Sequence, residues 1–355
     1  MKTTTDNICI TDLTDSQILE LMVEWGKPAY RAKQLRSWVY QRLADSFDEM
    51  TELPEPLRQK LTQQTRLHSL TPKHEVVGKD STAKALFTLV DGKTIESTLM
   101  SYPAEGGKHR HTLCVSTQVG CPVGCPFCAT GQQGFERNLT PGEIIDQVLY
   151  FARQLREQQN SVTNLVFMGM GEPLANYDNL LQAIGMLNSP DGFGLGARHM
   201  TISTAGLVPQ IKRLSLEKLQ VGLAVSLHAS DNSIRNKLVP INKKYPLEML
   251  IPACKEYFDK TGRRVSFEYA LFKGINDSVR HSRSLARLVG DSDCHINLIR
   301  ANHTTNQAFQ PSVSGIVTAF EKELKRLGVA CTLRQPRGLD IDAGCGQLRS
   351  RFITG

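Results

Sequence analysis

The sequence predicts an α/β fold: an incomplete (β/α)6 barrel that follows a small N-terminal helical domain. Two observations support this prediction. Short apolar runs typical of strands alternate with helical patterns from about residue 110 onward, and residues 12–70 show helical patterns alone. The chain has 355 residues, which is long enough for one barrel-sized domain and a small appendage.

Three helices are expected in the first domain, at residues 16–25, 29–42 and 54–64, separated by Gly/Pro or acidic turns. Apolar residues recur at approximately helical spacing in the second of them: Ala29, Leu35, Trp38, Val39 and Leu43. This stripe is typical of a helix that packs against a core. We therefore expect a helical accessory domain over residues 1–73.

The next segment, 74–105, changes from helical to strand-like spacing. Two candidate strands, 85–89 and 94–99, flank Asp91-Gly92, a dipeptide typical of tight hairpin turns. We expect a β-hairpin extension there.

The barrel is expected over residues 106–355. Its strands are predicted at 112–116, 164–168, 200–204, 222–227, 266–272 and 296–300, and a last helix at 313–327 leads to a strand at 330–334. One intervening helix has a clear start, where Thr140, Pro141 and Glu143 supply an N-cap, a first-turn proline and a capping-box acid. Active sites in such folds lie at the carboxyl ends of the strands.

Charge and composition restrict the function. The formal net charge is +7, and the basic excess lies after residue 75, which permits contact with RNA phosphates without establishing it. The first residues form neither a signal peptide nor a targeting helix, and no apolar run approaches the ~18 residues that span a bilayer. We therefore expect a cytoplasmic protein, with no membrane contact and with reduced thiols.

Three cysteines in the run CPVGCPFC, namely Cys121, Cys125 and Cys128, follow the first predicted barrel strand. Three thiolates on one loop can hold three irons of a cubane iron–sulfur cluster, which leaves the fourth iron open to a small molecule. Zinc is an alternative, because Cys114, His109 and His111 lie nearby. A ferredoxin-type cluster motif would have tighter cysteine spacing and a fourth cysteine. The other cysteines are scattered along the chain, which does not favour a disulfide framework.

The cysteine spacing, with Phe127 before the last cysteine, is similar to that of radical S-adenosylmethionine (SAM) enzymes. The longer run TLCVSTQVGCPVGCPFCATGQQGFERNLTPGEI resembles the RlmN family of RNA adenine C2 methyltransferases. So do the N-terminal AYRAKQLRSWVYQR and these further segments: FMGMGEPLANYDN, TISTAG, VSLHAS, VPINKKYP, GIND, INLIRANH and DIDAGCGQL. The resemblance covers nearly the whole chain. A sister group, the Cfr type, methylates C8 of the same ribosomal adenosine and shares most of these motifs.

The resemblance implies a radical SAM barrel, a [4Fe-4S] cluster on Cys121, Cys125 and Cys128, and two SAM molecules per turnover. The residues matching the family's SAM contacts are Gly171, Glu172, Ser203, Ser226, Leu227, His228 and Asn302. Three more residues match the family's catalytic groups. Cys345 matches the cysteine that carries the methyl group, Cys114 the thiol that resolves the protein–RNA adduct through a disulfide, and Glu96 the proton acceptor.

The implied substrates are 23S rRNA and tRNA, and the implied electron source is a one-electron reductant such as flavodoxin or ferredoxin. We expect a monomer, in which the N-terminal domain helps to hold RNA. Two departures from the family stand out: Gly344 replaces a common alanine before the carrier cysteine, and Arg300-Ala301-Asn302-His303 replaces Pro-Trp-Asn-Pro. The arginine also occurs in the C8 group, whereas Pro173 and Lys243-Lys244 favour the C2 group.

Overall fold

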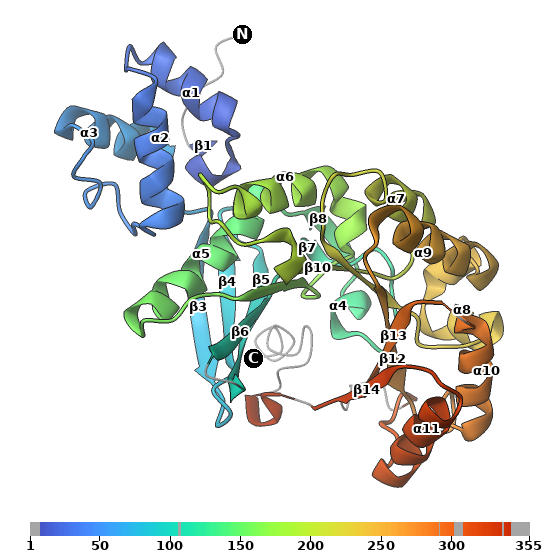
Figure 1. Ribbon diagram of the computed structural model, residues 1–355. Helices are drawn as coiled ribbons and strands as arrows, with labels where there is room; N and C mark the ends of the chain where they lie inside the picture. Colours follow the sequence, from blue (N-terminus) through green and yellow to red (C-terminus); the bar gives the residue numbers. More distant parts are fainter. Residues whose placement is uncertain (1–7, 106–107, 291, 302–307, 336, 342–355) are drawn as a thin grey trace.

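The computed structural model describes residues 8–105, 108–290, 292–301, 308–335 and 337–341 (Figure 1). Its main feature is a ten-stranded mixed sheet in the order β14-β13-β12-β11-β10-β9-β6-β5-β4-β3. The sheet curves around an interior, and helices cover its outer side (Figure 1). This is the predicted α/β fold, an incomplete barrel with a helical N-terminal domain.

The parallel part of the sheet matches the predicted strand–helix alternation. Its strands are β6 (Lys108–Cys114), β9 (Asn164–Phe167), β10 (Met200–Thr204), β11 (Gly222–Ser226), β12 (Val265–Leu271), β13 (Cys294–Arg300) and β14 (Cys331–Arg334). Neighbouring strands in this part all pair in parallel. The connecting helices are α5 (Pro141–Glu157), α6 (Tyr177–Asn188), α7 (Val208–Leu214), α8 (Asn232–Leu238), α9 (Leu247–Thr261), α10 (Val279–Val289) and α11 (Ser314–Arg326).

Helix α5 forms as its sequence predicts. The Thr140 side chain accepts a hydrogen bond from the Glu143 backbone, and the Glu143 side chain caps the Thr140 backbone in return. The apolar stripe from Ile144 to Ala152 is buried against the sheet. Short 3-10 turns complete the connections: η3 (Pro173–Asn176), η4 (Ala197–His199), η5 (Pro240–Lys243) and η6 (Leu339–Ile341).

Three antiparallel strands extend the sheet beyond β6: β3 (Leu70–Val77), β4 (Ala83–Leu89) and β5 (Thr94–Glu105). The predicted hairpin turn at Asp91-Gly92 joins β4 to β5, with Gly92 at φ +79°. The sequence pattern did not indicate β3, because this edge strand is mostly exposed and bulges between Pro72 and His74. An edge strand needs no buried apolar face, so it leaves a weak pattern.

The open side of the barrel is bridged by the chain that follows β14. The Asp80 carboxylate accepts a hydrogen bond from the Gly338 backbone at 2.9 Å, and the Asp340 carboxylate accepts one from the Lys79 backbone at 2.8 Å. These two reciprocal contacts join residues 338–340 to the β3–β4 turn. The last described residues are thereby fixed next to the first strands of the sheet.

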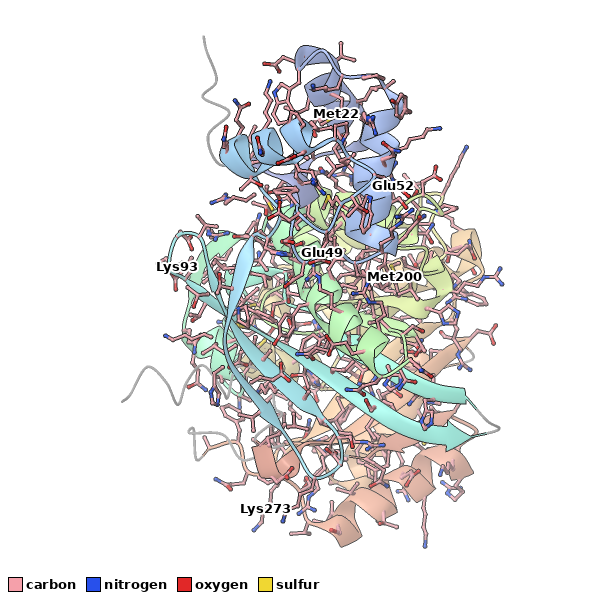
Figure 2. All side chains as sticks on the ribbon, turned by 90° about the vertical axis from the view of Figure 1, so that its left-hand side faces the viewer. Met22, Glu49, Glu52, Lys93, Met200 and Lys273 are labelled. Carbon is pink, nitrogen blue, oxygen red and sulfur yellow. The ribbon has the colours of Figure 1, made fainter. Side chains whose placement is uncertain are left out.

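The N-terminal domain contains the three predicted helices, α1 (Asp15–Glu24), α2 (Tyr30–Arg36) and α3 (Glu55–Gln64). The predicted helix at 29–42 is α2 continued by a π-helical turn, η2 (Ser37–Gln41). A 3-10 turn, η1 (Ile10–Asp12), follows β1 (Ile8–Cys9), which pairs in parallel with β2 (Thr65–Arg66). Met22 is buried in the core of this domain, whereas Glu52 lies on its surface (Figure 2).

Polar contacts attach this domain to the N-terminal end of α5. The Asp12 carboxylate accepts a hydrogen bond from the Gly142 backbone at 2.7 Å, and a Cβ on Gly142 would lie only 2.7 Å from that oxygen. The backbone N–H of Ser69 and its hydroxyl both donate to Asp146 at 2.6 Å. An acid at a helix N-terminus also complements the helix dipole. The domain is thus held to the barrel at defined points.

Among the described residues, no helix combines the length and apolar character that crossing a bilayer demands.

Candidate active site

The three cysteines lie on a loop between two short antiparallel strands that follow β6, namely β7 (Gln118–Gly120) and β8 (Phe135–Asn138). The Cys121 backbone donates to Gly134 at 2.8 Å, and the Cys128 backbone donates to Cys125 at 3.1 Å. Gly120 has φ +73°, and a Cβ there would collide with the Gly134 carbonyl. A short helix, α4 (Ala129–Gln132), begins directly after Cys128. The loop conformation therefore depends on its glycines and its backbone bonds.

Phe127 fixes this loop against the strand ends. Its ring lies 5.2 Å from the His228 ring and 5.0 Å from the Phe272 ring, measured between centroids, and 6.3 Å from Phe309. His228 follows β11 and Phe272 follows β12. The aromatic residue expected from the motif thus joins the cysteine loop to the carboxyl ends of two parallel strands.

The donor set suits a cluster better than a single ion. Burial raises the pKa of the Cys121 thiol to about 12 and raises that of Cys125 well above its ordinary value, and the neighbouring thiols and Glu172 add to the effect. Such thiols become thiolates only beside strong positive charge, which iron provides. Within the described ranges, no three His, Cys, Asp or Glu side chains converge to hold one metal ion. Cubane ligands need not converge, because each thiolate binds a different iron.

Glu172 lies in the loop after β9, as the sequence predicts, and its carboxylate is fully enclosed. Oε2 accepts a hydrogen bond from the Ala205 backbone at 2.6 Å, and Oε1 accepts one from Leu174 at 3.1 Å. Burial raises the pKa of Glu172 to about 7, against the opposing effect of these hydrogen bonds. Gly171 has φ +109°, and a Cβ there would press on Gln118 at 2.7 Å. This buried carboxylate is suited to receive an ammonium group.

The Ser226–His228 turn after β11 is held by backbone bonds to β12. The N–H groups of Leu227 and His228 both donate to the Glu268 carbonyl, at 3.0 and 3.2 Å. His228 has φ +55°, and its Nδ1 accepts from the Ala270 backbone at 3.0 Å. Burial lowers the pKa of His228 to about 3, so the ring is neutral. Ser203 lies on the adjacent strand β10.

Arg235 is a residue of the site that the sequence analysis missed. Its guanidinium is completely buried and donates to the carbonyls of Ala205 (2.7 Å), Ser226 (3.1 Å) and Leu227 (3.1 Å). It also donates to Asn242 Oδ1 at 2.7 Å. Burial lowers the pKa of Arg235 to about 10, at which the side chain is still charged at neutral pH. One cation thus fixes the loops that follow β10 and β11.

Glu96 and Cys114 lie on neighbouring strands. Thr98 of β5 is in register with Cys114 of β6, and Glu96 is two residues from Thr98, so period-two alternation places Glu96 and Cys114 on one face of the sheet. Such diagonal neighbours are about 7–8 Å apart. Ser116 ties this region together, since its hydroxyl donates to the Glu96 carbonyl at 2.5 Å and accepts from the Met170 backbone at 2.8 Å.

Two predicted site residues, Cys345 and Asn302, lie outside the described residues. The eight described cysteines are all free thiols, so the part of the chain that the structure describes contains no disulfide. His109 and His111 stack on each other with ring centroids 6.1 Å apart, and the His111 Nδ1 lies 3.0 Å from the Ser101 hydroxyl. Among the residues that the structure describes, neither histidine belongs to a group of three His, Cys, Asp or Glu side chains that could hold one metal ion.

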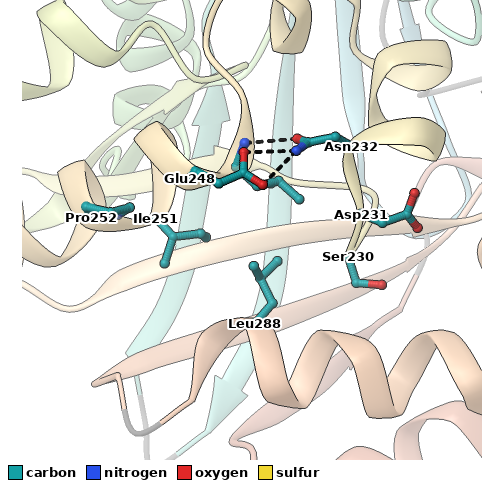
Figure 3. Close-up of a pocket in the computed structure, with 8 residues that line it drawn as sticks. Ser230, Asp231, Asn232, Glu248, Ile251, Pro252 and Leu288 are labelled. Carbon is teal, nitrogen blue, oxygen red and sulfur yellow. Dashed lines mark hydrogen bonds between the residues drawn. The ribbon is translucent and has the colours of Figure 1, made fainter.

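A surface pocket between α8, α9 and α10 contains none of the predicted site residues (Figure 3). Its polar pair is already satisfied, because the Asn232 amide donates to both carboxylate oxygens of Glu248 at 2.9 Å. This pocket therefore adds no residue to the group that lies at the strand ends.

Comparisons with known proteins agree with this geometry. One family model, the radical SAM superfamily, matches residues 115–286, and a second, the ribosomal RNA large subunit methyltransferase N-terminal domain, matches residues 8–67. A protein of Staphylococcus haemolyticus named "Probable dual-specificity RNA methyltransferase RlmN" is 44% identical over 342 residues, covering 96% of this chain and 93% of that protein. A protein of the same name from Staphylococcus aureus is 43% identical over 346 residues, 98% of this chain and 94% of its own length.

Among solved structures, a radical SAM methyltransferase from Sphaerobacter thermophilus superposes with a TM-score of 0.92 and 47% sequence identity. The superposition covers 96% of this chain and 98% of the other.

Proposed function

Because this chain belongs to the RlmN family of radical SAM RNA methyltransferases, we propose that it methylates C2 of adenosine in 23S rRNA and in tRNA. The observation that carries this proposal is the placement of Glu96 and Cys114 on one face of neighbouring strands, directly before the cysteine loop. A base and a thiol beside a cluster loop are the groups that such a transfer requires.

The cofactors are assigned to this chain's own residues. Cys121, Cys125 and Cys128 hold a [4Fe-4S] cluster, and Glu172 accepts the ammonium of SAM in the loop held by Ala205. Gly171, Ser203, Ser226, Leu227, His228 and Asn302 complete the SAM site. When bound, the cluster and SAM supply one-electron chemistry, which makes a carbon radical able to attack an electron-poor aromatic carbon. Two SAM molecules would be used per turnover, and the Cys345 thiolate would first accept the methyl group of one of them.

The remaining steps belong to protein side chains. The S-methyl group of Cys345 would lose one hydrogen atom to the radical chemistry that SAM supplies, and its carbon would become bonded to C2 of the base. Glu96 takes the C2 proton, and the one electron released in that bond exchange would return to the cluster. The Cys114 thiolate then attacks the Cys345 sulfur, which breaks the bond between sulfur and methylene. The electron pair of that bond stays on the methylene carbon, which takes up the proton held by Glu96 and leaves as the methyl group of the product. This leaves a Cys114–Cys345 disulfide, which an external reductant such as flavodoxin or ferredoxin must reopen; such a protein also supplies the single electrons.

The proposed domains are an N-terminal helical domain at 1–73, a hairpin extension at 74–105 and a core at 106–355. The N-terminal domain helps to hold the RNA. Cation–aromatic pairs support this role: Lys60 lies 4.5 Å from the Trp25 ring, and Arg42 lies 4.4 Å from the Trp38 ring. Tyr30 is 52% exposed beside Arg31. Aromatic faces and cations together suit bases and phosphates. The proposed enzyme is a cytoplasmic monomer.

The direct test is nucleoside mass spectrometry of RNA modified in vitro by protein reconstituted without oxygen. The proposal requires 2-methyladenosine, together with about four irons and four sulfides per chain. The second candidate is the Cfr-type reaction at C8, because Arg300 also occurs in that group, and 8-methyladenosine as the main product would replace our proposal with it. Stoichiometric zinc without sulfide in anaerobically purified protein would contradict both.

A further inference from the structure

The interior of the barrel contains a buried carboxylate that the proposed chemistry does not use. Glu268 lies in the middle of β12, and 4% of its surface is exposed. Its strand neighbours Phe267 and Tyr269 belong to the hydrophobic core beneath the outer helices. Because side chains alternate along a strand, Glu268 faces the other side, toward the interior.

The register of the sheet places Glu268 beside the proposed SAM site. It pairs with Ser226 of β11 on one side and with Asn297 of β13 on the other. Paired positions on adjacent parallel strands point to the same face, about 4.8 Å apart. Ser226, Glu268 and Asn297 therefore form one row across the interior wall.

Only one of the two oxygens of the Glu268 carboxylate accepts hydrogen bonds from described residues. Oε1 accepts from the Asn297 amide at 2.8 Å and from the Arg334 guanidinium at 3.3 Å. Oε2 is buried and has no partner among the described residues. Asn297 makes no other hydrogen bond within the described ranges, so its Oδ1 is a second acceptor next to the first. A buried carboxylate oxygen without a donor is unfavourable, which indicates that a ligand supplies one.

Two adjacent acceptors beside a guanidinium define what can bind there. An exocyclic amino group offers two N–H donors and no acceptor, and in adenine it stands next to the ring acceptor N1. Hypoxanthine and guanine place a carbonyl oxygen at C6, which a carboxylate would repel. The amino group of guanine at C2 stands beside the N1–H donor, which would face the Arg334 guanidinium instead of an acceptor.

We propose that Glu268 and Asn297 bind the exocyclic amino group of an adenine inside the barrel, with Arg334 directed at its N1, and thereby select adenosine against guanosine. The inference rests on the proposed function, since it takes the barrel interior as the place where adenine is held. Two adenines could occupy it, the target base of the RNA and the adenine of SAM, and the experiment separates them.

The test uses Glu268→Gln in the full-length, cluster-loaded protein. The glutamine carbonyl can keep the bonds from Asn297 and Arg334, while its NH2 replaces the free acceptor by a donor. The wild-type protein is first given an unmodified RNA that contains one adenosine which the protein methylates. The same RNA is then made with purine riboside, which lacks the amino group, or with inosine at that position. RNA affinity is measured by fluorescence anisotropy and single-turnover methylation by mass spectrometry.

In the wild-type protein, purine riboside should lower affinity or rate about tenfold to hundredfold. Glu268→Gln should show a similar loss on adenosine, no further loss on purine riboside, and a relative gain on inosine, whose carbonyl accepts from the new NH2. Glu256→Gln, on the outer helix α9 and paired with Lys260, is the matched control and should behave as wild type.

A parallel arm measures binding of SAM and of its inosyl analogue to both proteins by equilibrium dialysis. If removal of the amino group weakens SAM binding in the wild type but not in Glu268→Gln, while the RNA experiments show no such difference, the site is assigned to the adenine of SAM. The inference is overturned if removal of the amino group lowers affinity or rate equally in the wild type and in Glu268→Gln, both for RNA and for SAM. If the wild-type protein methylates no adenosine, the proposed function fails separately. The wild-type comparison of adenosine with purine riboside needs no variant, so absence of any loss there also counts against an amino-group site on the RNA side.

Discussion

The ammonium nitrogen of Lys84 lies 3.5 Å from Oε2 of Glu96, and both side chains are buried, with 1% and 4% of their surface exposed. The pair joins β4 to β5 diagonally, because Lys84 is in register with Thr98 and Glu96 with Leu86. Two charges removed from water are tolerated only when each compensates the other. Lys84 thus lies against the carboxylate of the proposed proton acceptor within the barrel wall.

Replacing Lys84 by methionine should lower the free energy of unfolding by about 3–5 kcal/mol, because it leaves a buried carboxylate without its cation. Urea unfolding followed by circular dichroism measures this. The double variant Lys84→Met/Glu96→Gln should recover most of the loss, since it removes both charges. If Lys84→Met is as stable as wild type, the two side chains do not form the buried pair.

The raised pKa of Glu172 predicts a pH dependence. In the folded chain this pKa is about 7, above the ordinary value of 4.5, so the folded state holds this proton more tightly than the unfolded state. Its contribution to stability is therefore fully present below pH 4.5 and is lost as pH rises through about 7. Without SAM, Glu172→Gln should flatten the fall in stability of the protein between pH 5 and pH 8.

SAM binding should show the opposite trend. The ammonium of SAM favours the charged carboxylate, so affinity should increase from pH 6 to pH 8, and Glu172→Gln should weaken binding and remove this increase. Equilibrium dialysis at several pH values measures it. A wild-type affinity that is flat over this range, or one that falls, would argue against Glu172 as the ammonium acceptor.

Arg235→Ala should weaken SAM binding at least tenfold while the cluster still assembles. The substitution removes a donor from the carbonyls of Ala205, Ser226 and Leu227, of which Leu227 keeps the bond from the Ala229 backbone at 2.8 Å, and each buried carbonyl left unpaired costs roughly 1–3 kcal/mol. The matched control is Arg213→Ala, which removes an exposed pair with Asp178 and should change neither property. Unchanged SAM affinity in Arg235→Ala, with normal iron content, would show that the loops do not need this cation.

The double variant Asp80→Ala/Asp340→Ala should loosen the chain after β14. Each aspartate accepts a backbone N–H from the other segment, so the pair joins residues 338–340 to the β3–β4 turn. Hydrogen exchange in residues 337–341 should become faster, and methylation of Cys345, which follows this segment in the chain, should slow. Unaltered exchange there would show that other contacts hold the segment.

Much of this fold could be predicted because its signals are local. Each parallel strand contains a short run of strand-forming residues between turn or helix signals, the start of α5 is a capping box, and the turn at Asp91-Gly92 determines the β4–β5 hairpin. The cysteine spacing likewise indicates its chemistry without tertiary information. Most boundaries of these elements lie close to the predicted ones, but β5 continues beyond its predicted end at residue 99 to Glu105.

Other features depend on contacts that no local pattern records. Arg235 lies in a short helix and acts through hydrogen bonds to loops up to 30 residues away in the sequence. Strand β3 was not predicted, because an exposed edge strand needs no apolar face. The Lys84–Glu96 pair could have been found, since the hairpin turn determines the register and two charges in apolar strands are unusual.

The most direct test of the account is Cys114→Ala in the full reaction with RNA and SAM. Once the methylene group joins Cys345 to the base, only a thiolate attack on the Cys345 sulfur frees the product, and Cys114 lies at the end of β6 beside the cluster loop. We predict a protein–RNA adduct that survives denaturation, whereas Cys345→Ala should give neither adduct nor methylated adenosine. Full turnover by Cys114→Ala, with free 2-methyladenosine and no adduct, would contradict the account.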